Sequence, residues 1–206
     1  MKKVLLMSVV VCFGTLQADF MDEPVVFVQA SAQSKPTYDQ FRGSLSAAHN
    51  AAFGDAFLFK QALDQKHVKN WTQAMKEAKN YVKKTAVLDR DFAVLSLNNA
   101  MDTLVEASNT IVLYIVESYR SFFGAYAQEQ AASGELIKEE QAASKELISQ
   151  QLQPVIKKLT ALEESFAKKI KKGYHDPRNQ QAAELVHYLA LALVTTAEKV
   201  QRDLRK

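Results

Sequence analysis

Hydrophobic residues recur at intervals of three and four along most of the chain, the spacing that places them on one side of an α-helix. The clearest stripe consists of Val94, Leu97, Met101, Leu104, Ser108, Ile111, Ile115 and Phe122. Its regular alternation is typical of the seam between packed helices. Residues Ile111 to Val116 are apolar on every side, which predicts a central position for this helix.

The pattern before this stripe predicts one helix that begins near Thr37. Thr37-Tyr-Asp-Gln40 matches a capping box, in which two side chains satisfy backbone N–H groups at the helix start. We expect a break or kink near Gly54 or Asp64, because glycine weakens a helix and the apolar spacing is interrupted there. The face expected in the core is Phe41, Leu45, Ala48, Ala52, Phe59, Leu63, Val68, Trp71, Met75, Ala78 and Val82.

Two further helices are predicted on either side of residue 173. A helix from about Gln128 to Lys172 follows the central one, whose start is expected at Asp89 or Asp91. Its expected core face is Leu136, Ala143, Leu147, Val155, Leu159, Leu162, Phe166 and Ile170. A last helix follows Asp176-Pro177, a cap followed by proline at the first helical position. Its face is Ala182, Val186, Leu189, Leu193, Ala197, Val200 and Leu204.

Interruptions of the third helix leave its shape open. Pro154 cannot donate a backbone hydrogen bond and is expected to kink or restart the helix, and Gly173 is suited to end it. The sequence leaves open whether a turn at Gly124 or at Gly134 separates it from the preceding helix, and without a break at either the molecule would be a longer rod. An all-α fold is therefore predicted, an elongated antiparallel bundle of four long, kinked helices that count as five or six if the breaks are complete.

The segment from Gln130 to Ile148 contains a near repeat, QAASGELI followed eleven residues later by QAASKELI. Eleven residues are close to three helical turns, so the repeat keeps Ala132, Leu136, Ala143 and Leu147 on one side of a straight helix. Lipid-surface proteins also use such repeats, but their polar faces are usually rich in lysine and arginine, whereas this segment is acidic. We interpret the repeat as helix shape.

The N-terminus has the pattern of a secretory signal. Lys2 and Lys3 precede an apolar run at 4–13 that is too short to span a membrane, and Ala18 is a plausible cleavage position. The domain prediction is a signal peptide at 1–18, a linker at 19–36 and one helical-bundle domain at 37–206. Cys12, the single cysteine, lies inside the signal, so the mature chain would lack disulfides and cysteine chemistry. Export to the periplasm or the extracellular space is expected.

Charge is balanced overall but segregated along the chain. Removal of residues 1–18 leaves 24 basic and 23 acidic residues, which argues against general nucleic-acid binding. Residues 60–86 hold seven lysines and two acids, residues 155–173 hold six lysines and two acids, and residues 128–150 hold five glutamates and two lysines. Opposite charges on neighbouring helices could select the pairing order. The lysines predicted to bind a partner are Lys76, Lys79, Lys83, Lys84, Lys168, Lys169 and Lys172.

Two other groups of residues are candidate sites. Tyr119, Phe122, Phe123 and Tyr126 form an aromatic cluster that either closes the end of the core or lines an apolar pocket. Glu184-x-x-His187, with Asp64-x-x-His67 as a looser copy, has the spacing of the metal ligands in ferritin-like di-metal bundles. That family needs Glu-x-x-His twice, so no metal and no cofactor is predicted.

The sequence contains no Gly-rich phosphate loop, no His-Glu-x-x-His and no Gly-x-Ser-x-Gly motif, and we expect the protein not to be an enzyme. The leading hypothesis is a non-enzymatic bundle that binds another protein through its lysine-rich faces. A membrane-active or lipid-binding protein, using the basic helix at 155–172 or the apolar stretch at 104–127, is the alternative, and a di-metal bundle is the third. Peripheral membrane contact and homo-oligomers stay open.

Overall fold

The computed structural model describes residues 37–54, 65–88, 93–128 and 134–205, and side chains among them except at 120–141. These residues form five helices and no strand: α1 (Tyr38–Phe53), α2 (Gln65–Thr85), α3 (Ala93–Gln128), α4 (Gly134–Lys172) and α5 (Pro177–Leu204). The all-α prediction is confirmed. The first predicted helix is two helices, since α1 ends at Phe53 next to the expected break at Gly54.

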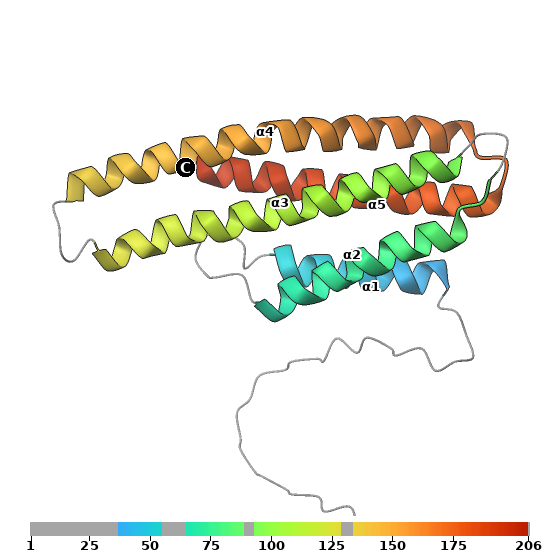
Figure 1. The fold of residues 1–206 in the computed structure, drawn as a ribbon, viewed down its shortest axis with the longest axis horizontal. Helices are drawn as coiled ribbons and strands as arrows, with labels where there is room; N and C mark the ends of the chain where they lie inside the picture. Colours follow the sequence, from blue (N-terminus) through green and yellow to red (C-terminus); the bar gives the residue numbers. More distant parts are fainter. Residues whose placement is uncertain (1–36, 55–64, 89–92, 129–133, 206) are drawn as a thin grey trace, which may run out of the picture.

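The helices form two groups that pack on each other (Figure 1). The α3–α4–α5 trio contains the three helices of the C-terminal part, with α4 in contact with both α3 and α5. The α1–α2 hairpin packs on it, since α2 contacts α3 and α5, and α1 contacts α5. Within the described residues α2 and α4 both pack on α3 but not on each other, and α3 runs between them in Figure 1.

The predicted start of α1, the predicted start of α5 and the predicted end of α4 are confirmed. At α1, the Gln40 N–H donates to Thr37 Oγ1 at 3.3 Å and the Thr37 N–H donates to Gln40 Oε1 at 3.0 Å, which completes the capping box. At α5, Asp176 Oδ1 accepts from the Arg178 N–H at 2.8 Å. Gly173 ends α4 with φ +80°, a conformation that glycine adopts without steric cost. Asp89 and Asp91 lie outside the described residues.

The predicted core faces of α3 and α5 are confirmed. Every residue predicted on the α5 face is buried, and the buried positions of α3 include Leu97, Met101, Leu104, Ser108, Ile111 and Ile115. Val94 is half-buried, and the Phe122 side chain lies outside the described part. In the hairpin, Leu45, Ala48, Ala52, Trp71, Met75, Ala78 and Val82 are buried. Phe41 and Val68 are half-buried, and Phe59 and Leu63 lie outside the described residues.

The predicted core face of α4 is partly wrong. Leu147 is 55% exposed and Ala143 is exposed, whereas Ile148 and Leu152 are buried. The sequence offers two adjacent apolar rows, at 147 and at 148, and the second is the buried one. The eleven-residue repeat reports the period of the helix but not which row a neighbouring helix covers. Ala132 and Leu136 lie outside the described part.

Of the two possible breaks before α4, the structure has the one at Gly134, and α4 ends at Lys172 as predicted. The preceding helix, α3, continues through Gly124 to Gln128, and α4 begins at Gly134 rather than at Gln128. The helix does not restart at Pro154, which lies inside α4 on its exposed side. A proline on the solvent side is tolerated because water can satisfy the carbonyl group that loses its partner.

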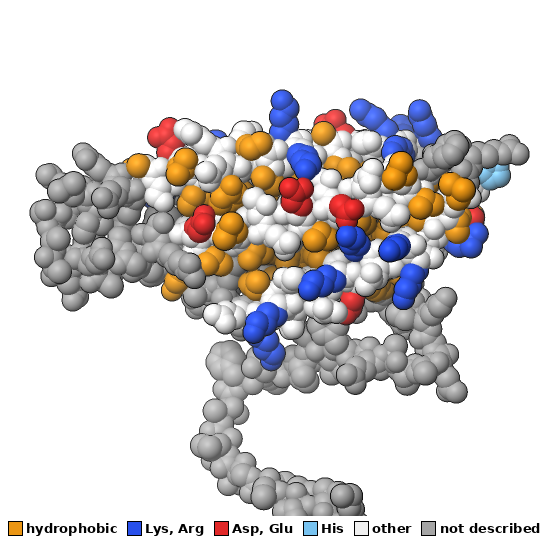
Figure 2. All heavy atoms as spheres, viewed as in Figure 1, with side chains coloured by type: hydrophobic (Ala, Val, Ile, Leu, Met, Phe, Trp, Pro, Cys, Tyr) orange, Lys and Arg blue, Asp and Glu red, His pale blue; other side chains and the backbone are white. Residues whose placement is uncertain are grey.

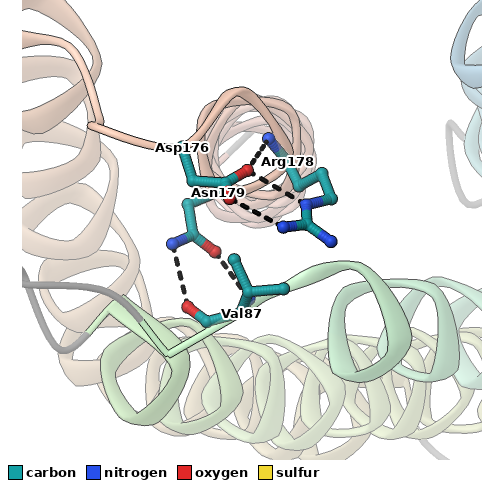
Figure 3. A network of polar contacts seen from close by, with 4 residues as sticks. All are labelled: Val87, Asp176, Arg178 and Asn179. Carbon is teal, nitrogen blue, oxygen red and sulfur yellow. Dashed lines mark hydrogen bonds and ion pairs between the residues drawn. The ribbon is translucent and has the colours of Figure 1, made fainter.

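Polar contacts join the hairpin to the trio at several buried or half-buried points. Trp71 Nε1 donates to Ser108 Oγ at 2.8 Å, and His49 Nε2 lies 3.0 Å from Thr196 Oγ1. The side chain of Asn179 is fully buried and bonds twice to the backbone of Val87, as Figure 3 shows. The Val87 N–H donates to Asn179 Oδ1 at 2.9 Å, and Asn179 Nδ2 donates to the Val87 carbonyl at 3.0 Å. These contacts fix the positions of α1 and α2 relative to α3 and α5.

Candidate functional site

The lysines of α2 divide into two sides of the helix. Lys79 forms an ion pair with Asp102 of α3, so its side of α2 borders α3. Lys83 follows it by one turn, and Lys76 precedes Lys83 by seven residues, as Lys69 precedes Lys76. Residues seven apart lie nearly in line along a helix. Lys69, Lys76 and Lys83 therefore form a row of exposed cations along the solvent side of α2.

Lys84 lies on the other side of α2. It is three residues after Tyr81, whose ring stacks on Phe41 of α1 with the centroids 4.9 Å apart. Residues three apart share a helix face, so Lys84 points toward the α1 side. Lys84 therefore lies on a different side of α2 from Lys79, which pairs with α3.

The lysines of α4 divide in the same way. Lys158 Nζ lies 3.3 Å from Glu106 Oε2 of α3. Lys169 and Lys172 line a hollow of about 150 Å³ together with Ala93, Ser96, Gly173 and Tyr174. Because Ala93 and Ser96 belong to α3, these two lysines also lie beside it. Lys169 is held by a cation–π contact, with Nζ 4.8 Å from the centroid of the Phe166 ring.

Lys168 and Lys171 complete the basic end of α4. Lys168 is exposed one turn before Lys172. Lys171 lies eight residues after Glu163, whose carboxylate accepts from or pairs with His187 of α5 at 2.8 Å. Since positions four and eight apart follow one side of a helix, Lys171 lies toward the α5 side, away from α3.

We call one surface of the molecule the lysine face. It consists of the outer side of α3 and of the lysines on its two flanks, which are Lys69, Lys76, Lys79 and Lys83 of α2 and Lys158, Lys168, Lys169 and Lys172 of α4. Figure 2 shows blue side chains over α4 and α2 with α3 between them. The acids Asp102 and Glu106 of α3 are each paired to one of these lysines. Both pairs are exposed and contribute about 0–1 kcal/mol each to stability, but they leave a surplus of positive charge on this face.

The charge pairing between neighbouring helices differs from the prediction. The basic α2 does not lie against α4 in the described residues, and its side chains pair with α3 instead. The acidic segment at 128–150 has most of its side chains outside the described part. The lysines of α2 and of α4 thus lie on the two sides of α3, which itself contains no lysine.

The other candidate sites are not assembled in the described part of the chain. Glu184 accepts from Gln180 Nε2 at 2.9 Å, while His187 contacts Glu163, and the described residues contain no cluster of three or more side chains able to hold a metal. Asp64 lies outside the described residues, and His67 is half-buried on α2. Of the aromatic cluster, Tyr119 is half-buried, and the side chains of Phe122, Phe123 and Tyr126 lie outside the described part.

Two titratable side chains with displaced pKa values lie in the hairpin. Burial lowers the pKa of His49, whose ring contacts Phe53 and Trp71. Burial and the nearby Glu184 carboxylate raise the pKa of the Tyr38 phenol to about 12. Both groups are neutral near pH 7. They lie between α1 and its neighbours, apart from the lysine face, and have the character of packing residues.

Comparison of the chain with known protein families, with curated proteins and with solved structures gives no match. Among the described helices, none combines the length and the apolar character that crossing a bilayer requires.

Sequence reasoning missed several residues of this face. The seven-residue spacing of Lys69, Lys76 and Lys83 is visible in the sequence, but Lys69 is not among the lysines predicted to bind a partner. Lys158 could not be selected because its place beside α3 depends on how α3 and α4 pack. Helical spacing separates Lys83 from Lys84 and Lys172 from Lys171, but which member of each pair lies on the α3 side depends on packing.

Proposed function

We propose that this protein is an exported, non-enzymatic helical bundle that binds an acidic region of another protein through the lysine face. Export is inferred from the N-terminal sequence. In this proposal the elongated antiparallel bundle expected from the sequence acts as a scaffold, with α1 and α2 in the place of its first rod. Its role is to present fixed rows of cations.

One observation carries the proposal. Lysines from two helices that do not touch each other in the described residues line both flanks of α3, and the α3 acids Asp102 and Glu106 are already paired. Positive charge arranged in this way attracts a negatively charged surface and speeds association at low salt. Another explanation is that lysines in the last turns of α2 and α4 stabilise the helix dipoles.

Neighbouring lysines distinguish these explanations. Lys83 and Lys84 share the last turn of α2, and Lys171 and Lys172 share that of α4, so each pair interacts similarly with its helix dipole. Only Lys83 and Lys172 lie on the lysine face. Charge reversal at this pair, K83E/K172E, is expected to abolish partner capture, whereas K84E/K171E is expected to retain it.

The test is affinity capture from the native envelope or secreted fraction after crosslinking, with captured proteins identified by mass spectrometry. We expect an acidic partner whose recovery falls at high salt and is lost with K83E/K172E. Equal recovery with both double variants would contradict the proposal. Flotation with anionic vesicles tests the membrane-active alternative, and vesicle binding in place of protein capture would favour it.

A further inference from the structure

We propose that the ligand of the lysine face is an acidic amphipathic helix of about five turns, lying along α3 between the lysine rows of α2 and α4. This inference rests on the proposed function and specifies the shape of the partner. It follows from the apolar side chains that the lysine face leaves exposed and from their spacing along α3.

Exposed leucines are concentrated on this face. The described residues contain five large hydrophobic side chains that are markedly exposed: Leu88, Leu95, Leu113, Leu147 and Leu191. Leu95 and Leu113 are 69% and 53% exposed and lie 18 residues apart on α3, which is five full turns. They therefore point in the same direction, outward from the core, and are separated by about 27 Å along the helix axis.

Leu147 of α4 belongs to the same surface. It lies eleven residues before Lys158, about three turns back in the same row, and so it borders α3. The Lys158–Glu106 pair sets the register of the antiparallel α3 and α4 (Figure 1). In this register Leu147 lies about one turn beyond Leu113, beside the exposed Glu117 of α3. The leucine that the sequence pattern placed in the core thus adds a second apolar side chain at this end of the face.

The opposite end of the face is built around Leu95. The same register places Lys169 of α4 beside it, and the hollow shared by Ser96, Lys169 and Lys172 confirms this placement. From α2, the Lys79–Asp102 pair places Lys83 near this end. An apolar anchor therefore lies between lysines from both flanking helices, and the hollow offers room for a carboxylate of the ligand.

The middle of the face is polar. Asn99, Asp102, Glu106 and Asn109 occupy the outer side of α3 between the two leucines. A straight ligand with apolar side chains toward its ends and acidic residues along both edges complements this arrangement. Helix-in-groove recognition has this form, and an all-helical surface offers no free sheet edge on which an extended peptide could add a strand.

Other classes of ligand fit the face less well. A helix surface that binds in a bilayer needs a broad apolar side, whereas here three leucines are separated by polar residues and ion pairs. Nucleic-acid surfaces favour arginine beside lysine, but neither α2 nor α4 contains an arginine. The observations therefore favour a protein helix.

The test uses purified full-length protein and a fluorescein-labelled synthetic helix of about 20 residues, rich in Glu and Ala with one stripe of Leu. A peptide of the same composition, scrambled so that the stripe is lost, is the matched control. Fluorescence anisotropy is measured at low and high salt. We expect the striped peptide to bind at least about tenfold more tightly than the scrambled one, and salt to weaken binding.

Protein variants separate the two proposals. L113S/L147S, which alters exposed side chains only, is expected to weaken the striped peptide about tenfold and to leave the scrambled peptide unchanged. K83E/K172E is expected to weaken both peptides, and K84E/K171E neither. If the two peptides bind alike and the serine variant has no effect, the helix ligand is wrong while lysine-mediated binding stands.

Further outcomes also decide the matter. Equal effects of K83E/K172E and K84E/K171E overturn both the lysine face and the proposed function. Tighter binding to vesicles with anionic lipid or to double-stranded DNA than to the striped peptide overturns the helix ligand. Light scattering tests for a dimer. If the protein is a dimer that only K83E/K172E or L113S/L147S dissociates, the lysine face binds a second copy of this chain, and the helix ligand is overturned.

Discussion

The α1–α2 hairpin and the α3–α4–α5 trio are stabilised in different ways. The trio has helices of 36, 39 and 28 residues that pack through many Leu, Val, Ile and Ala side chains. The hairpin has helices of only 16 and 21 residues and relies on aromatic rings. Trp71 is fully buried, with its ring centroid 5.6 Å from that of Phe53 and 5.3 Å from that of His49.

This difference has a physical cause. A long helix offers many core positions, so each aliphatic side chain contributes a modest part of the stability. A short helix offers few core positions, so the side chain at each of them must bury a large area. Tyr and Trp also carry a polar group whose hydrogen bond fixes the orientation of the side chain. The hairpin should therefore depend on single residues more strongly than the trio does.

The largest effect is expected from Trp71→Ala. The substitution leaves a cavity and removes the partner of Ser108, and we expect a loss of about 3–5 kcal/mol in the free energy of unfolding. Urea unfolding followed by circular dichroism measures it, and hydrogen exchange should show α1 and α2 opening before α5. Leu189→Ala, in the fully buried seam of α5, is the control and should destabilise without this selectivity. A loss below about 1 kcal/mol for Trp71→Ala would contradict the comparison.

Asn179→Ala is expected to uncouple the two groups of helices. It removes both hydrogen bonds to Val87 and leaves a backbone N–H and a carbonyl without these partners, which costs about 2 kcal/mol. Arg178→Ala serves as the matched neighbour, because its ion pair with Asp176 is exposed and should matter little (Figure 3). Equal losses for the two substitutions in urea unfolding would show that Asn179 does not link hairpin and trio.

His49 should make the hairpin sensitive to acid. Burial lowers the pKa of His49 in the folded state, so the unfolded chain takes up the proton first as the pH falls. Stability from this group is complete above the unfolded pKa of about 6.5 and is lost below it, by at most about 1.4 kcal/mol at pH 5.5. His49→Gln cannot titrate and should flatten this part of the pH dependence in urea unfolding at pH 7.5 and 5.5. An unchanged slope would refute the assignment.

The smallest effect is expected from Tyr38→Phe. The Tyr38 hydroxyl is buried without a hydrogen-bond partner among the described residues, so its removal should leave stability unchanged or raise it by up to about 1 kcal/mol. Thermal unfolding measures the change in stability. The substitution also removes the Tyr38 phenol, whose pKa is about 12, from the titration of the protein. A loss of more than about 1 kcal/mol would mean that the hydroxyl has a stabilising partner.

The sequence predicted well those features that depend on neighbours along one helix. The capping box at Thr37, the cap at Asp176, the glycine at the end of α4 and the stripes of α3 and α5 are all confirmed. The periods of these patterns survive in the structure because the helical repeat is set by local backbone geometry. The prediction that lysine-rich helices bind a partner stays a prediction, although packing now separates the lysines into different sides.

By itself, the sequence determined that the chain forms helices, where several of them begin and end, and which residues of α3 and α5 are buried. Only the tertiary structure decided that Ile148 rather than Leu147 is buried, that α3 lies between two lysine rows, and that Lys83 and Lys84 face different sides. The reason is that apolar periodicity specifies the faces of a helix, whereas the choice of face for each neighbour depends on side-chain packing between segments far apart in the chain.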